Sequence, residues 1–361
     1  MDYQTEKQML YTKRLRAVIK ELPDFCGYYF RSIETTTSIL TRYGYAVDLK
    51  SFFLFLTDEI ECCKNKPLKS LTLSDLNQIR SVDIEKYMEY ISLYQVDDTK
   101  IRSNKERAKS RKLAAIKSFF KYYYKQEMID NNVAGLVDTP KLHEKAIIRL
   151  DVNEVADFLD TVEQGNGLSN RQQGYHDITK VRDTAIMTLF LGTGIRISEL
   201  VGIDIKDIDF ERDQFVVTRK GGNQERLSFG PEVRNALLEY LSERDSVTPL
   251  PGHENALFLS LQKKRITARA VENLVKKYAK LSTPLKKITP HKLRSTYGTM
   301  LYQESGDIYL VADVLGHKDV NTTRKHYAAI TEERRRTAAK YIKLRDENPD
   351  SLDKQNPSDN E

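Results

Sequence analysis

The sequence is poor in cysteine, and its three cysteines argue against two kinds of small fold. Cys26, Cys62 and Cys63 are odd in number and include no Cys-x-x-Cys pair. A disulfide framework needs paired cysteines, and a structural zinc site needs closely spaced ligands. The sequence therefore predicts neither of them, no bound metal and no cofactor, and it favours a reducing, cytoplasmic location.

Long apolar runs are missing as well. No stretch of the chain approaches the roughly 20 apolar residues that cross a bilayer. The first ten residues, MDYQTEKQML, lack the apolar segment of a secretory signal. We therefore expect no association with a membrane. Hydrophobic residues still make up 40% of the 361 residues, which is enough for packed cores and predicts two domains.

Helical periodicity dominates residues 1–138. Ile84, Tyr87, Met88 and Ile91 follow the i, i+3, i+4, i+7 spacing of an amphipathic helix, and the segment 113–123 repeats that spacing. Thr139-Pro140 opens a polar stretch that resists helix formation. The pattern predicts an all-helical N-terminal domain over 1–138 and a linker over 139–150.

The remaining residues predict a second domain over 151–344. Asp151 with Glu154 forms the capping-box pattern of a helix start. The polar stretch 164–173 predicts an exposed loop, and two β-rich runs, 215–218 and 226–229, surround a glycine turn. The fold class is therefore mainly α with a small antiparallel hairpin or sheet. Residues 345–361 are acidic and almost without apolar side chains, which predicts a disordered tail.

Positive charge is concentrated between residues 100 and 125. Ten lysines and arginines in this segment accompany a single acid, Glu106. Lys105, Lys109 and Lys112 recur at helical spacing beside an aromatic run, so we expect this face to bind DNA phosphates. A solvated helix face is the plainer alternative, although such faces usually carry both signs of charge.

Five places in the second domain hold residue types that suit phosphate chemistry. Each of them has an ordinary structural explanation when it is taken alone, such as an i, i+3 ion pair, a charged turn or a capped surface helix. In chain order they are Arg196 with Glu199 after the turn Gly192-Thr193-Gly194; Lys220 at the hairpin tip; His291 and Arg294 behind Thr289-Pro290; His317; and Tyr327.

Taken together, these residues suit the cutting of DNA by a tyrosine. Attack on a phosphodiester builds negative charge on the non-bridging oxygens, which two arginines and imidazole N–H groups can stabilise. A phenol with a pKa of about 10 must lose its proton during the attack, which favours a nearby histidine as general base. A lysine can protonate the departing 5′ oxygen. The resulting 3′-phosphotyrosyl bond allows the strand to be resealed without ATP.

The order of the motifs resembles the tyrosine recombinases, the phage-integrase-like family, and within it the bacterial Xer group. The motifs are Thr-Gly-Ile-Arg-Ile-Ser-Glu-Leu, His-Lys-Leu-Arg and Leu-Gly-His-Lys followed by His-Tyr. The resemblance implies that Tyr327 is the nucleophile, that Glu199 supports the first arginine, and that the remaining residues activate the phosphate. These phosphate-activating residues are Arg196, Lys220, His291, Arg294 and His317.

The same resemblance implies an architecture and partners. The N-terminal helices would form a SAM-like core-binding domain beside the catalytic tyrosine-recombinase domain. The expected substrate is double-stranded DNA with inverted-repeat arms, bound by a dimer at each site and by a tetramer in the synapse. The expected role is resolution of chromosome dimers before cell division, with an FtsK-type DNA translocase as partner.

The hairpin run Arg219-Lys220-Gly221-Gly222-Asn223 is longer by one residue than the Gly-Lys-Gly-Asn of typical Xer hairpins.

Other functions remain open at this point. Asp204, Asp207 and Asp209 could supply carboxylates to a metal-dependent nuclease, although turn chemistry explains them more simply. An architectural DNA-binding protein would need only the basic face. A type IB topoisomerase shares the chemistry, and an integrase of a mobile element shares the fold and the reaction.

Overall fold

The computed structural model describes residues 3–97, 100–141, 143, 148–219 and 222–316. The chain divides between residues 146 and 147 into two compact units, here called unit 1 and unit 2. None of the helices in the described ranges is long and apolar enough to cross a membrane. The fold is mainly helical with small antiparallel sheets, which confirms the fold class expected from the sequence.

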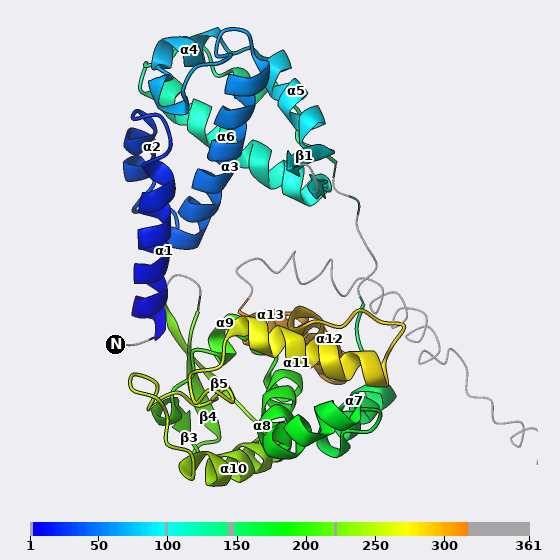
Figure 1. The fold of residues 1–361 in the computed structure, drawn as a ribbon. Coiled ribbons are helices and arrows are strands. Elements are labelled where there is room, and N and C mark those ends of the chain that lie inside the picture. Colours follow the sequence, from blue (N-terminus) through cyan, green and yellow to red (C-terminus); the bar gives the residue numbers. More distant parts are fainter. Residues whose placement is uncertain (1–2, 98–99, 142, 144–147, 220–221, 317–361) are drawn as a thin grey trace, which may run out of the picture. The chain divides into compact units, whose positions relative to one another are not determined.

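Unit 1 is built mainly from helices (Figure 1). They enclose a core rich in aromatic side chains. Phe52 and Phe53 of α3 pack against Phe119 and Phe120 of α6, with ring centroids 5.6 Å apart for the Phe53–Phe119 pair. The elements are α1 (Tyr3–Ile19), α2 (Cys26–Ser32), α3 (Ile39–Glu59), η1 (Leu68–Ser70), α4 (Leu73–Gln78), α5 (Ser81–Tyr90), β1 (Tyr94–Asp97), β2 (Lys100–Arg102), α6 (Glu106–Lys125) and η2 (Val133–Leu136).

The expectation that this unit is entirely helical was wrong at one place. Strands β1 and β2 pair antiparallel between α5 and α6, with Tyr94 opposite Arg102. The segment contains Tyr94, Val96 and Ile101, which are residue types that favour strands. The helical periodicity of the flanking segments ends before this hairpin and resumes after it.

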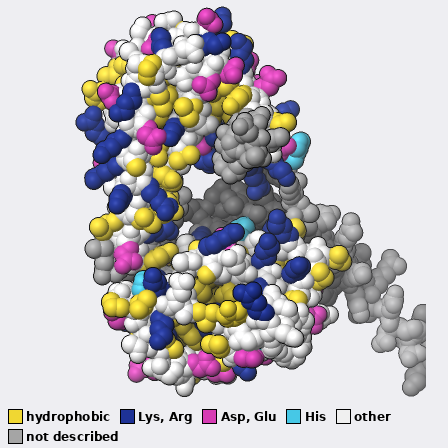
Figure 2. All heavy atoms as spheres, in the orientation of Figure 1, with side chains coloured by type: hydrophobic (Ala, Val, Ile, Leu, Met, Phe, Trp, Pro, Cys, Tyr) yellow, Lys and Arg dark blue, Asp and Glu magenta, His cyan; other side chains and the backbone are white. Residues whose placement is uncertain are grey.

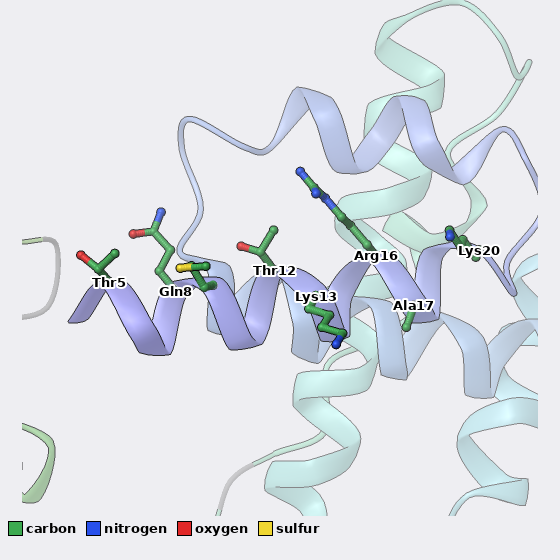
Figure 3. A pocket seen from close by; sticks show the side chains of 8 residues that line it. Thr5, Gln8, Thr12, Lys13, Arg16, Ala17 and Lys20 are labelled. Carbon is green, nitrogen blue, oxygen red and sulfur yellow. The ribbon is translucent and has the colours of Figure 1, made fainter. Parts of the chain in front are cut away.

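A groove follows one face of α1, with threonine and glutamine side chains toward the start of the helix and cations toward its end (Figure 3). Its lining includes Thr5, Gln8, Lys13, Arg16 and Lys20. In the space-filling view, lysine and arginine side chains stand out along the α1 side of unit 1 (Figure 2). The groove lies wholly within unit 1 and shares no residue with the polar cluster of unit 2 described below.

Unit 2 is organised around α8, which packs against α7, α10 and α12. Its helices are α7 (Val152–Gln164), α8 (Asn170–Thr193), α9 (Ile197–Leu200), η3 (Ile205–Asp207), α10 (Pro231–Asp245), α11 (Ala268–Ser282), α12 (Pro290–Ser305) and α13 (Ile308–Val314). Buried Asp183 of α8 accepts hydrogen bonds from Tyr278 of α11 at 2.8 Å and from Arg182 at 2.7 Å. This buried polar contact joins α8 to α11.

The strands of unit 2 form one antiparallel sheet in the order β3-β4-β5. They are β3 (Ile208–Asp209), β4 (Gln214–Thr218) and β5 (Gln224–Ser228), and Phe215 pairs with Leu227 in the hairpin. The hairpin agrees with the sequence prediction, and β3 adds a third strand. The loop expected over 164–173 is shorter than predicted, because Ser169 forms a capping box with Gln172 and α8 already begins at Asn170.

Candidate active site

The first catalytic motif occupies the turn between α8 and α9. Gly194 has φ +62, a left-handed conformation that favours glycine. A Cβ atom at this position would lie 2.4 Å from Cδ1 of Tyr297, so a larger residue does not fit without a shift. The turn ends α8 and places Arg196 at the N-cap position of α9.

Glu199 holds both the backbone and the side chain of Arg196. Its Oε2 accepts a hydrogen bond from the Arg196 backbone N–H at 3.0 Å, and its Oε1 accepts one from Nη1 at 2.8 Å. Glu199 is 4% exposed, whereas one third of the Arg196 side chain faces solvent. The carboxylate therefore orients an arginine whose remaining surface stays accessible to an anion.

Helix α12 supplies the second arginine. The helix begins at Pro290 behind Thr289, as the sequence predicted, and Arg294 lies one turn further along. Arg294 is buried and donates from Nη1 to the Gly194 carbonyl at 2.5 Å and from Nη2 to the Leu315 carbonyl. His291 is exposed in the first turn of the same helix. In Figure 2, Lys and Arg side chains gather on the side of unit 2 where α12 lies.

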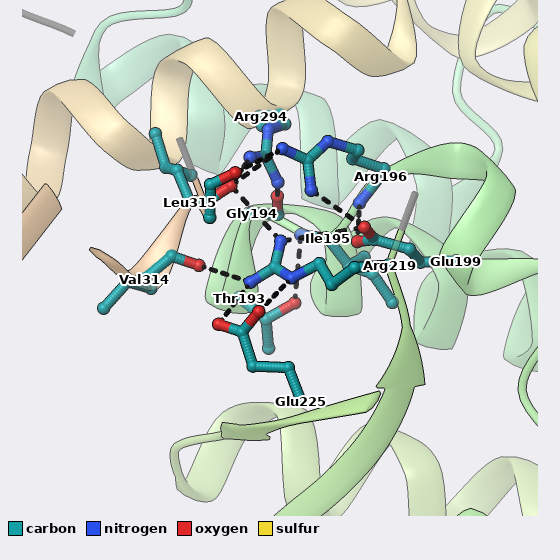
Figure 4. A network of polar contacts seen from close by, with 11 residues as sticks. Thr193, Gly194, Ile195, Arg196, Glu199, Arg219, Glu225, Arg294, Val314 and Leu315 are labelled. Carbon is teal, nitrogen blue, oxygen red and sulfur yellow. Dashed lines mark hydrogen bonds and ion pairs between the residues drawn. The ribbon is translucent and has the colours of Figure 1, made fainter. Parts of the chain in front are cut away.

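Three guanidinium groups converge on the C-terminal end of α13 (Figure 4). The Leu315 carbonyl accepts hydrogen bonds from Arg196 at 3.0 Å, from Arg219 at 3.2 Å and from Arg294. Arg196 also donates to the Gly316 carbonyl at 3.0 Å. The last carbonyls of a helix have no partner within the helix and carry partial negative charge, so they attract cations. Arg196, Arg219 and Arg294 are called the arginine cluster below.

Three of the expected site residues lie outside the described residues. They are Lys220, His317 and Tyr327. Residues 345–361, the expected tail, also lie outside the described residues. The chain positions next to two of them are described: Arg219 precedes Lys220, and Gly316 precedes His317. Both neighbours belong to the arginine cluster or contact it. The described part of the site therefore adjoins two of these three positions along the chain.

Sequence reasoning missed Arg219 as a site residue. Its side chain is 8% exposed and forms ion pairs with Glu225 at 2.5 Å and with Glu199 at 3.6 Å. The only available signal was the unusual hairpin run, in which an arginine stands before the lysine. A charged residue beside a turn ordinarily faces solvent, and nothing local revealed that this one is buried.

The three aspartates of the alternative metal site are engaged elsewhere. Asp204 accepts from Arg265, and Asp207 accepts from the Asp204 backbone N–H at 2.9 Å as part of a capping box. Asp209 accepts from Arg212 at 2.9 Å, and these hydrogen bonds lower the pKa of its carboxyl. No group of three or more potential metal ligands occurs in the described part of the chain. Capping and turn chemistry account for these residues.

The basic face expected on α6 needs a correction at Lys112. Its side chain is buried, and Nζ donates to Asp48 of α3 at 3.3 Å. Burial raises the pKa of Asp48, and Lys112 and Arg111 oppose that rise. Lys105 is exposed and Lys109 is partly exposed, so these two remain available to a phosphate. The helical spacing was read correctly, but Lys112 falls on the buried stripe that continues with Ile116 and Phe119.

The fold is similar to that of solved proteins bound to DNA. The XerH site-specific recombinase bound to palindromic difH substrate, a post-cleavage complex, matches with a TM-score of 0.61 at 19% identity. That match covers 84% of this chain and 80% of XerH. A lambda integrase dimer bound to a COC′ core site matches with a TM-score of 0.59 at 16% identity, covering 84% and 93%. Both matches are below 25% in sequence identity, and they show that this chain has the fold of these two proteins.

Sequence similarity places the chain more narrowly. The model of the phage integrase family matches residues 149–334. The tyrosine recombinase XerC of Caldanaerobacter subterraneus subsp. tengcongensis is 35% identical over 84% of this chain and 81% of its own length. XerS of Lactococcus lactis subsp. cremoris is 30% identical over 87% and 93%. The chain belongs to the phage integrase family and is a DNA strand-transferring, site-specific tyrosine recombinase, which confirms the expected Xer resemblance.

Proposed function

We propose that the protein resolves chromosome dimers before cell division, by cutting and rejoining DNA in the cytoplasm through a 3′-phosphotyrosyl intermediate. One observation carries the assignment of the site. Arg196 and Arg294 come from separate segments of unit 2, and both donate to the Leu315 carbonyl, two residues before His317. Two arginines held this close together suit the non-bridging oxygens of one phosphate.

Each residue of the site has a role in this proposal. Tyr327 attacks the phosphorus, forms the new P–O bond and gives its proton to His291 or His317. The P–O5′ bond breaks, and Lys220 gives a proton to the departing oxygen. Arg196 and Arg294 stabilise the charge of the transition state, and Glu199 orients Arg196. Atoms and electrons balance without a metal ion, a cofactor or ATP.

We further propose a DNA substrate, an oligomeric assembly and a partner for this protein. Unit 1 is assigned to core binding and unit 2 to catalysis. The substrate is a double-stranded site with inverted-repeat arms, bound by two protomers and paired with a second site in a tetramer. The XerH complex with its palindromic difH substrate supports an inverted-repeat site, and the relatives named tyrosine recombinase XerC and XerS support recombination as the reaction. An FtsK-type translocase completes the proposed set of partners.

Covalent capture of genomic DNA tests this function. The protein is incubated in EDTA with fragmented DNA of its own genome, and SDS then stops the reaction and traps the covalent complexes. We expect the trapped fragments to share one inverted repeat near the replication terminus. Fragments from the ends of a mobile element would instead assign an integrase role. Trapping that requires a divalent cation would contradict the metal-free reaction.

A second prediction concerns the basic face of α6. Lys105→Gln with Lys109→Gln should weaken binding to every DNA sequence, because each lost phosphate contact lowers the slope of log affinity against log salt by about 0.9. The measurement is a salt titration of DNA affinity. Lys64→Gln with Lys69→Gln removes the same charge from exposed lysines outside α6 and should leave the slope unchanged. Equal slopes in both double variants would show that this face of α6 does not bind DNA phosphates.

Lys112→Met separates the buried lysine from that surface. It leaves Asp48 buried with Arg111 as its remaining ion-pair partner among the described residues, so the free energy of unfolding should fall. The salt dependence of DNA binding should stay that of the unmodified protein, because Lys112 does not reach the surface.

A further inference from the structure

Arg219 stands at the point where the hairpin β4–β5 leaves its paired strands. Thr218 and Gln224 form the last registered pair of the hairpin. Beyond that pair, the Arg219 backbone N–H donates to the Asn223 carbonyl at 2.8 Å, and the Gly222 backbone N–H donates to the Arg219 carbonyl at 3.1 Å. Lys220 is the next residue in the chain. The backbone of Arg219 is therefore the last part of β4's side of the hairpin that the structure describes before Lys220.

The side chain of Arg219 is held from two sides. Nε and Nη2 donate to the two carboxylate oxygens of Glu225 on β5 at 2.5 and 2.8 Å. On the other side, Nη2 donates to the Val314 carbonyl at 3.1 Å and Nη1 to the Leu315 carbonyl at 3.2 Å. One planar guanidinium thus ties the hairpin to the end of α13 (Figure 4).

The fit around this guanidinium leaves little room for movement. Gly316 packs against it so closely that a Cβ there would lie 2.6 Å from Arg219 Cζ. Glu199, which orients Arg196, lies 3.6 Å from Arg219 Nη1. The hairpin, the end of α13 and the partner of the first catalytic arginine therefore meet at one buried side chain.

We propose that Arg219 is a positioning residue that fixes the base of the hairpin against α13, and that proton transfer by Lys220, the next residue in the chain, depends on this anchoring. The proposal rests on the role of Lys220 as the proton donor, stated above. A lysine at position 219 would keep the charge but could not bridge Glu225 and two carbonyls at once, because an ammonium lacks the planar fork of donors.

A sulfur-substituted DNA tests this role directly. The substrate carries sulfur in place of the bridging 5′ oxygen at the cleavage position. A thiol has a pKa near 8.5, so a thiolate can leave without a proton, whereas an alkoxide cannot. Cleavage of the sulfur substrate should therefore no longer depend on Lys220. It should still depend on the residues that stabilise the phosphate.

We expect Arg219→Lys to slow single-turnover cleavage of ordinary DNA by about 10- to 100-fold, since a displacement of ~1 Å can cost about 10²-fold. On the sulfur substrate its rate should return to that of the unmodified protein. Lys220→Ala should behave in the same way, with a loss of about 10²- to 10⁴-fold on ordinary DNA. Arg196→Ala should be slow on both substrates.

Arg244→Ala is the matched control. Arg244 is also a buried arginine of unit 2 that donates to backbone carbonyls, but it contacts Glu254 and Ala256. Its loss should reduce stability without changing the ratio of the two cleavage rates. Where Arg219→Lys fails to fold, Glu225→Gln takes its place, because it retains Arg219 and weakens only the contact with β5.

Three outcomes would overturn the inference. Arg219→Lys or Glu225→Gln could cleave ordinary DNA at the unmodified rate, or could be equally slow on both substrates. The same sulfur rescue in Arg244→Ala would show that general destabilisation produces the pattern. If Lys220→Ala is not rescued by sulfur, the proposed role of Lys220 fails. That result is distinguishable, because it is read from Lys220→Ala alone.

Discussion

Tyr327→Phe is expected to abolish covalent attachment to DNA and all strand exchange, while DNA affinity stays unchanged. The substitution removes the phenolic oxygen, which is the atom that forms the phosphotyrosyl bond. The hydrogen bonds from Arg196 and Arg294 to the Leu315 carbonyl do not involve this hydroxyl and remain in place. A nicked suicide substrate, resolved on a denaturing gel, measures the covalent complex, and a gel shift measures the affinity.

Two further tyrosines make this experiment specific. Tyr309→Phe changes an exposed tyrosine of α13 and should leave covalent attachment at the unmodified level. Tyr297 lies close to Gly194, and burial raises the pKa of its phenol against the opposing charge of Arg294, so this hydroxyl loses its proton less readily than a free phenol does. A covalent complex that persists in Tyr327→Phe would assign the nucleophile to another residue.

Arg294→Ala should slow single-turnover cleavage by at least ~10²-fold, the usual loss when a transition state is deprived of one charged donor. DNA affinity should fall far less, because many other cations contact the backbone. Some loss of stability should accompany it, since the Gly194 carbonyl loses the Arg294 donor. The cleavage rate is therefore measured well below the unfolding temperature of the variant.

Two substitutions separate the catalytic effect from the structural one. Arg244→Ala removes a comparably buried arginine from unit 2 and should cleave at nearly the unmodified rate. Arg294→Lys keeps the charge but loses the fork that joins Gly194 to Leu315, so its rate should remain well below that of the unmodified protein. Cleavage by folded Arg294→Ala at the unmodified rate would remove Arg294 from the mechanism.

The parts of the site that could be predicted are those set by neighbouring residues. Arg196 and Glu199 are three positions apart, so their pairing follows from helix geometry. Thr289-Pro290 predicts the start of α12 because proline suits the first helical position. The shape of the hairpin follows from β-rich runs around glycines.

The parts that could not be predicted depend on contacts between distant segments. Lys112 matches the spacing of its exposed neighbours, and only Asp48, 64 positions earlier, shows that it is buried. Arg219 meets Leu315 across 96 positions. Single-sequence patterns report which side chains share a face, but not which face another segment will cover. The β1–β2 hairpin was missed for a simpler reason, since its strands are too short to show alternation.

The shared carbonyl at Leu315 has a consequence for the entropy of DNA cleavage. A free arginine side chain carries about 2 kcal/mol of rotamer entropy, which must be lost when it is fixed on a phosphate. Arg196 and Arg294 are already restrained by α13 before any DNA arrives. The rotamer entropy of these two side chains is therefore lost when unit 2 folds and not when DNA binds. The free energy of DNA binding remains available for bending and pairing the sites.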